Sequence, residues 1–323
     1  ADLRLSFEKA VNRPIGNLFS QWVNRVGAPA LQLAEVNSKK QDDGSQLDFE
    51  LRQIQADTAY HLRIPVAITL EGNEQTHQTI LRMSKKQQHF TLKLPARPVR
   101  IDVDPEFDLF RALDIKETPP AFTQLFGSKR MLVVLPRGSE PGLKSSWQAF
   151  AEDLAKMGPD SVKTAWDDEL ETLPEDQAVA VLGWRNRYAQ EVIEALSKHP
   201  VSFGSNSLKL EKTEISHANH AVALTFRPAG NESFARAFIA ADLPESLPGL
   251  GRKLPHYHKY SYLTFSGTEP QNRIKGRWPV TRSPMTAHLI KGAELGQLKK
   301  REALTRPPAV FDSSRMMKSI ELD

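Results

Sequence analysis

Residues 47–70, LDFELRQIQADTAYHLRIPVAITL, decide the fold of the first half of the chain. Apolar side chains occupy alternate positions in two runs, at Leu47, Phe49 and Leu51 and then from Ile64 to Leu70. A period of two places successive side chains on opposite faces of a strand, so each run predicts a strand with one buried face. The same pattern recurs along residues 31–104, with polar turns between the runs. We therefore expect six strands that form an immunoglobulin-like β-sandwich.

The second half of the chain changes from strands alone to strands that alternate with helices. An aliphatic run at 131–135 has the pattern of a fully buried strand, and residues 146–157 place apolar side chains at helical spacing. Two more strand-like runs and a helix follow, up to residue 196. This order predicts an α/β domain with a partly parallel sheet over residues 128–278.

Three segments lie outside these two domains. Residues 1–30 have apolar side chains at helical spacing and end in a Gly and a Pro, so they predict two short helices. Residues 105–127 contain a Pro-Pro pair and predict a linker. Residues 279–323, rich in Pro, Arg and Lys, predict an extended tail. The fold class is thus multidomain α+β, with a short helical segment, a β-sandwich and an α/β domain.

Composition excludes several classes of protein. The 43 basic and 39 acidic residues leave an excess of +4 that is spread along the chain. A nucleic-acid-binding surface would gather its basic residues and interleave aromatic ones, so we expect no nucleic-acid partner. The absence of cysteine removes disulfides and cysteine-ligated zinc. No apolar run approaches the roughly 20 residues of a membrane-spanning helix, so we expect no membrane span.

The N-terminal segment carries a distinctive combination of residues, FEKA at 7–10, LFSQWV at 18–23 and GAPAL at 27–31. It resembles the end of the catalytic domain of aminopeptidase N-like zinc metallopeptidases, where a helical passage leads directly into a β-sandwich. The IPV sequence at 64–66 extends the resemblance through the sandwich. Residues 12–14 depart from it, because the family more often has a small residue and Gly where this chain has Asn-Arg-Pro.

The resemblance implies a parent enzyme, a gluzincin aminopeptidase, that removes N-terminal residues from peptides through a zinc-bound water. Its metal needs HExxH on a helix and a further Glu, and none of the nine histidines stands in that pattern. The family's substrate-amine motif is also absent, and both motifs precede the matching segment. We therefore expect a truncated or processed, inactive C-terminal part, without catalytic, cofactor-binding or metal-ligating residues, and zinc in the parent only.

The resemblance also implies a role for each part. Residues 1–30 would be the helical remnant of a catalytic domain, which the sandwich buttresses. The α/β domain resembles an accessory domain of bacterial members at 254–257 and 259–262, and would dock on the sandwich, restrict access to the cleft or mediate oligomerisation. The expected partners are the missing N-terminal catalytic domain and, through the parent, peptide substrates. The compartment stays open between the bacterial periplasm and the cytoplasm.

Two pairs of histidines are candidate metal ligands. His256 and His258 would share one face of an extended backbone, but a third ligand is not visible. His217 and His220 are close in sequence only. Surface or loop positions are the commoner outcome for such residues, and we favour that interpretation.

An alternative function is an independent α/β module that binds a nucleotide or another ligand. The RGSEPGLKSS sequence at 137–146 follows a buried strand and precedes a helix, as a phosphate-binding loop does, and Lys144 and Ser145 are the residues to test. The spacing differs from the motif, because three residues rather than four separate Gly138 from Gly142, and Pro141 removes an N–H donor. The loop thus has the residues that any strand-to-helix connection needs.

Other polar and aromatic residues have a structural interpretation that we prefer. The acidic residues at 167–171 fit a turn or the start of a helix, although an acidic metal or acid–base cluster is the alternative. The aromatic residues, which could form a binding face, are expected to pack in a core or at a domain interface: Trp166, Trp184, Tyr257, Tyr260 and Tyr262. A last alternative is a protein-interaction module that exposes an apolar patch.

Overall fold

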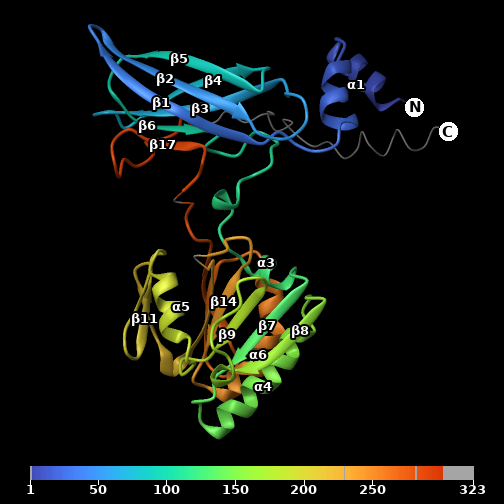
Figure 1. Ribbon diagram of the computed structural model, residues 1–323, viewed down its shortest axis with the longest axis vertical. Helices are drawn as coiled ribbons and strands as arrows, with labels where there is room; N and C mark the ends of the chain where they lie inside the picture. The colour runs from blue at the N-terminus through green and yellow to red at the C-terminus, as the bar shows by residue number, and fades with distance from the viewer. Residues whose placement is uncertain (1, 229, 281, 301–323) are drawn as a thin grey trace, which may run out of the picture. The chain divides into compact units, whose positions relative to one another are not determined.

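The computed structural model describes residues 2–228, 230–280 and 282–300, which form two compact units (Figure 1). Of these residues, the first unit contains those up to Ala112 and those from Pro284 to Lys300, and the second contains those from Leu113 to Ser283. The α/β unit therefore begins within the segment 105–127 expected to be a linker. The described part of the expected tail returns to the first unit.

Short helices open the first unit. They are α1 (Leu3–Val11), α2 (Gly16–Phe19) and a π-helix, η1 (Ser20–Asn24). Asp2 caps α1 by accepting the Arg4 N–H at 3.0 Å, and Asn12 ends the helix in the left-handed conformation, with φ at 48°. No residue of these three helices is buried.

A β-sandwich follows, as the alternation of apolar residues predicts. Its two antiparallel sheets have the strand orders β1-β2-β5 and β17-β6-β3-β4. Leu47, Phe49 and Ile64 are fully buried in the core that the sheets share. All six expected strands are present, and the segment after Pro284 adds a seventh. The strands are β1 (Leu31–Gln41), β2 (Gly44–Gln53), β3 (Leu62–Leu70), β4 (His77–Met83), β5 (Gln87–Leu94), β6 (Pro98–Val103) and β17 (Thr286–His288).

The second unit is built on a seven-stranded mixed sheet with the order β16-β15-β13-β14-β9-β7-β8. The pairs among β8, β7, β9 and β14 are parallel, and the remaining pairs are antiparallel, so the expected partly parallel sheet is confirmed. Its strands are β7 (Arg130–Leu135), β8 (Ser161–Trp166), β9 (Ala178–Leu182), β13 (His220–Phe226), β14 (Arg236–Ala240), β15 (Tyr262–Ser266) and β16 (Gln271–Gly276).

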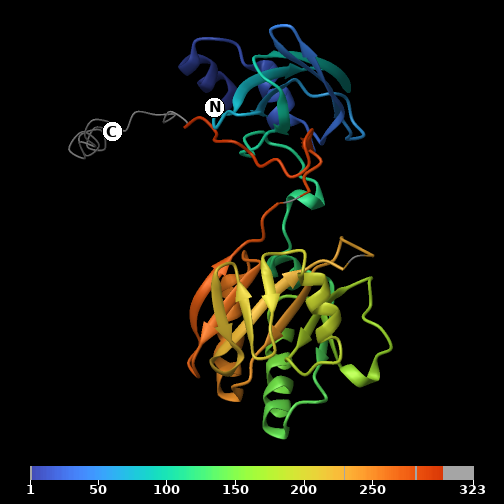
Figure 2. The same cartoon turned by 90° about the vertical axis from the view of Figure 1, so that its left-hand side faces the viewer.

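Both faces of this sheet are covered (Figures 1 and 2). On one face lie α3 (Phe122–Phe126), α4 (Pro141–Ala155) and α6 (Leu247–Lys253). On the other lie α5 (Ala189–Leu196) and a small antiparallel sheet of β10 (Val201–Phe203), β11 (Ser207–Leu210) and β12 (Thr213–Ser216), which faces the viewer in Figure 2. Short 3-10 turns connect the elements: η2 (Ile115–Glu117), η3 (Asp167–Glu169), η4 (His217–Asn219), η5 (Pro244–Ser246) and η6 (Leu254–Tyr257).

Candidate functional site

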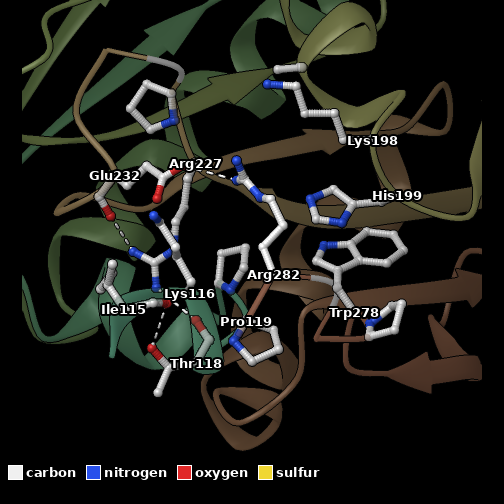
Figure 3. Close-up of a pocket in the computed structure, with 14 residues that line it drawn as sticks. Ile115, Lys116, Thr118, Pro119, Lys198, His199, Arg227, Glu232, Trp278 and Arg282 are labelled. Carbon is white, nitrogen blue, oxygen red and sulfur yellow. Dashed lines mark hydrogen bonds and ion pairs between the residues drawn. The ribbon is translucent and has the colours of Figure 1, made fainter. Parts of the chain in front are cut away.

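The α/β unit has a cavity of about 100 Å³ at the edge of the sheet where β13 and β16 end (Figure 3). Four separate segments line it: η2 and the residues after it, the end of α5, the turn after β13 and the residues after β16. This is the amino edge of the neighbouring parallel strand β14, because β13 runs antiparallel to β14. The residues that give the cavity its chemistry are Lys116, Lys198, His199, Arg227, Glu232, Trp278 and Arg282.

Trp278 anchors the cavity to the core of the unit. Its side chain is 1% exposed, and its indole N–H donates to the main-chain oxygen of Thr225 at 2.6 Å. The His199 ring stacks on the indole at 4.6 Å with an angle of 15° between the ring planes, and the Tyr262 ring lies 4.5 Å away. Aromatic packing of this kind fixes the position of the His199 ring at the cavity.

Two guanidinium groups are held at the cavity in different ways. Arg227 is half-buried and donates to two main-chain oxygens, those of Glu232 and, at 2.9 Å, of Thr118. Burial lowers the pKa of Arg227, and the negative charge of Glu232 opposes this shift. Arg282 is more exposed and forms an ion pair with the Glu232 carboxylate at 3.0 Å.

His199 is uncharged at neutral pH. Burial lowers its pKa from 6.5 to about 4, and the positive charges of Lys198 and Arg282 act in the same direction. The ring is therefore a neutral hydrogen-bonding group beside the cationic side chains.

The depressed pKa of His199 predicts a loss of stability in acid. Between about pH 6.5 and pH 4 the unfolded chain binds a proton that the folded chain does not, so the free energy of unfolding falls as pH falls through this window. After allowance for partial exposure of the ring, we expect a loss of about 1–2 kcal/mol. Urea unfolding at pH 7.5 and pH 4.5 measures it.

A His199→Gln variant isolates this contribution, because other groups titrate in the same range. The difference in unfolding free energy between wild type and variant should shrink towards acid pH. A difference that stays constant from pH 7.5 to pH 4.5 would mean that His199 does not titrate differently on folding.

The histidines considered as metal ligands lie in two parts of the α/β unit. His256 lies in η6 and His258 follows it, so the expected extended backbone is wrong there. The segment turns because the Leu254 side chain is buried in the core and Pro255 suits the start of a helix. The Nδ1 atom of His258 lies 3.0 Å from the Thr123 hydroxyl.

The other two histidines lie at the edge of the sheet where β13 begins: His217 in η4 and His220 as the first residue of β13. The His217 ring stacks on Trp184 at 3.6 Å, and the Nδ1 atom of His220 lies 3.0 Å from the Ser216 main-chain oxygen. Within residues 2–228, 230–280 and 282–300, no three His, Asp or Glu side chains are grouped to hold a metal ion.

Lys144 and Ser145 lie in the first turns of α4, after the loop that follows β7. The Ser145 hydroxyl donates to the Pro141 main-chain oxygen at 3.2 Å, and the Lys144 N–H donates to the Glu140 oxygen at 2.9 Å. The Ser145 hydroxyl is therefore bonded within the helix, whereas the bond of Lys144 involves its main chain and not its ammonium group. In an open α/β sheet, ligands bind at the carboxyl ends of strands whose connections diverge, as they do between β7 and β9.

At the carboxyl ends of β7 and β9, a side chain of the protein itself fills the position that a ligand would take. The buried Asn186 amide donates to the main-chain oxygens of Val134 at 3.1 Å and Leu182 at 3.0 Å, and so bridges the ends of β7 and β9. Gly183 has φ at +78°, and a Cβ there would lie 2.8 Å from the Pro136 ring. The loops after β7 and β9 therefore approach each other closely.

The acidic residues at 167–169 hold loops of the α/β unit together. The Asp167 carboxylate is buried and accepts the N–H groups of Arg137 at 3.0 Å and Arg187 at 2.7 Å. Asp168 and Glu169 form ion pairs with the Arg137 side chain at 3.1 and 2.7 Å. The three residues form η3, in agreement with the preferred structural interpretation.

The basic cavity is the feature that the sequence did not reveal. Its cationic residues come from segments that are up to 166 positions apart in the sequence. The residues next to each of them in the sequence show no motif that would indicate a binding site. Each of the four cationic residues, Lys116, Lys198, Arg227 and Arg282, comes from a different one of the four segments. A basic cluster that forms in this way has no linear signature.

No family model and no curated protein matches this chain. The solved structures that match include a flavohemoglobin from Malassezia yamatoensis with bound FAD and heme, at 12% identity and a TM-score of 0.14; the match covers 56% of this chain and 59% of that one. Another is the FAD/NAD-binding domain of a nitric oxide dioxygenase from Vibrio cholerae, at 14% identity and a TM-score of 0.13, covering 54% of this chain and 71% of that one. At these TM-scores the similarity carries no functional argument.

The helices in the described part of the chain are all too short or too polar to cross a membrane.

Proposed function

We propose that this chain is the non-catalytic C-terminal part of an aminopeptidase N-like zinc metallopeptidase, and that its N-terminal helices dock on the catalytic domain. The proposal combines the resemblance of residues 7–31 to that family with one structural observation. The helices α1, α2 and η1 expose large apolar side chains, with 62% of Leu3, 50% of Phe7, 52% of Leu18 and 60% of Val23 exposed.

These exposed residues form the kind of surface that another protein domain covers. Leu3, Phe7 and Val11 are spaced four residues apart and therefore lie along one face of α1. The Phe7 and Phe19 rings lie 6.2 Å apart, which joins this face to α2. A helix at a protein surface normally buries its apolar face, whereas no residue of α1, α2 or η1 is buried here. Contiguous exposed apolar residues mark a binding surface.

In this proposal the zinc and the residues that cleave peptides belong to the domain that docks on these helices. The sandwich supports that domain through the helices, because the Gln21 side chain of η1 exchanges hydrogen bonds with the main chain of His61, the residue before β3. The α/β unit is an accessory domain.

The test is to express this chain together with an HExxH-bearing domain encoded upstream of Ala1 and to measure their association and peptidase activity. We expect the two parts to co-purify. Replacing Leu3, Leu18 and Val23 by Ser should weaken the association at least about tenfold, because each buried side chain of this size contributes roughly 1.5–3 kcal/mol.

Ile80→Ser is the matched control, because Ile80 is 55% exposed on β4 of the same unit and lies outside the helices. It should leave the association unchanged. The proposal is wrong if no HExxH precedes the chain, or if the Ile80 variant weakens association as much as the helix variant does.

A further inference from the structure

Positive charge exceeds negative charge around the cavity of the α/β unit. Four cationic side chains line it: Lys116, Lys198, Arg227 and Arg282. Among the described lining residues, one side chain, that of Glu232, is a carboxylate. Glu232 is already paired with Arg282. A cation that is partly removed from water is costly unless an anion accompanies it. Arg227 is half-buried, and its hydrogen bonds within the described residues go to main-chain oxygens, so Glu232 is the shared counter-charge of Arg227 and Arg282.

Several N–H donors at the cavity are still available. One nitrogen of Arg282 binds Glu232, and its other N–H groups have no partner in the described part of the chain. The ammonium groups of Lys116 and Lys198 likewise have no carboxylate within 4.0 Å there. Figure 3 shows Arg227, Arg282 and His199 around the same space. Guanidinium forks and ammonium groups are the usual ligands of phosphate oxygens.

The size and walls of the cavity limit what it can hold. A cavity of about 100 Å³ has room for a phosphate group. The walls include Pro119, Pro120, Pro228 and Pro279, whose fixed backbone angles restrict its shape and which offer no N–H donors. Recognition therefore depends on the cationic side chains.

We propose that this cavity binds a phosphate group, either as the free ion or at the end of a small phosphomonoester. A phosphate carries between one and two negative charges near neutral pH and accepts hydrogen bonds at three or four oxygens, so it matches several donors that converge from different segments. A carboxylate carries one charge and is planar, and it would leave more of the positive charge uncompensated. This site is independent of the function proposed for the helices.

Titration calorimetry of the whole chain with inorganic phosphate, at constant ionic strength, tests the proposal. We expect a single site. Lys198→Gln and Arg282→Gln should each raise the dissociation constant at least about threefold, and together at least about tenfold. Both side chains are exposed, so neither change should impair folding. Lys212→Gln is the matched control, since it removes one exposed charge at the turn between β11 and β12, and it should bind like wild type.

Two further ligands determine what the site recognises. Tighter binding of glycerol 3-phosphate than of inorganic phosphate would assign the site to a phosphomonoester, and the reverse order would assign it to the free ion. Acetate should bind at least about tenfold more weakly than phosphate. The proposal is overturned if about 10 mM phosphate produces no binding heat, if acetate binds equally well, or if Lys212→Gln weakens binding as much as Arg282→Gln.

Discussion

Trp278→Ala is expected to lower the free energy of unfolding of the α/β unit by about 3–5 kcal/mol. The side chain is 1% exposed and lies within one of the two cores that flank the large sheet. Its removal leaves a cavity and exposes the His199 and Tyr262 rings that pack on it. The Thr225 main-chain oxygen also loses the indole N–H that it accepts at 2.6 Å.

Urea unfolding followed by tryptophan fluorescence measures this loss, because Trp147, Trp166 and Trp184 remain in the α/β unit as probes. Trp278→Phe is the control: it retains an aromatic ring but not the hydrogen bond, so it should cost less than Trp278→Ala. Equal losses for the two variants would show that the hydrogen bond, rather than the packed volume, is the main contribution. A loss below about 1 kcal/mol for Trp278→Ala would contradict the packing described here.

The role of Trp278 at the cavity could not be predicted from the sequence. This residue follows the last strand of the large sheet and lies at the expected end of the α/β domain, with nothing in its neighbours to indicate a cavity. Its partners His199, Thr225 and Tyr262 come from other segments. Sequence patterns describe one element at a time, and a cavity made by several elements appears only when they pack.

Elements with strong periodicity were predicted well. Leu47, Phe49 and Leu51 alternate with polar or charged residues along β2, and the structure buries all three. The aliphatic run at 131–135 is a strand with helices on both faces of its sheet, which explains why it lacks alternation. In both cases the number of buried faces of the strand determines how apolar residues are spaced along it.

Short elements that depend on distant partners were not predicted. The strand β17, Thr286–His288, has three residues and pairs with β6, which is more than 180 positions earlier in the sequence. The Thr286 hydroxyl donates to the buried Asp102 carboxylate at 2.8 Å. Neither contact follows from the polar composition of the segment. The small sheet β10-β11-β12 was not predicted for the same reason, because its strands contain three or four residues each and are too short to show a period.

Arg111→Met is expected to lower the free energy of unfolding of the first unit by about 3–5 kcal/mol. The Arg111 Nε atom donates to the Asp104 carboxylate at 2.8 Å, and the two side chains are 1% and 0% exposed. Burial raises the pKa of Asp104, against the opposing effects of Arg111 and the N–H groups of Leu109 and Asp108. The carboxylate is therefore already costly to bury, and Arg111→Met removes the cationic partner that offsets much of this cost.

Adding Asp104→Asn to Arg111→Met should recover more than half of this loss, because it removes the unpaired charge. Asn also tolerates the φ of 54° at this position and can still accept the N–H groups of Asp108 and Leu109, at 2.8 and 3.1 Å in the wild type. We expect calorimetry to show a separate transition for each unit, and the transition of the α/β unit should not move. If the double variant is no more stable than Arg111→Met, then lost packing of the long Arg side chain, rather than the buried charge, explains the destabilisation.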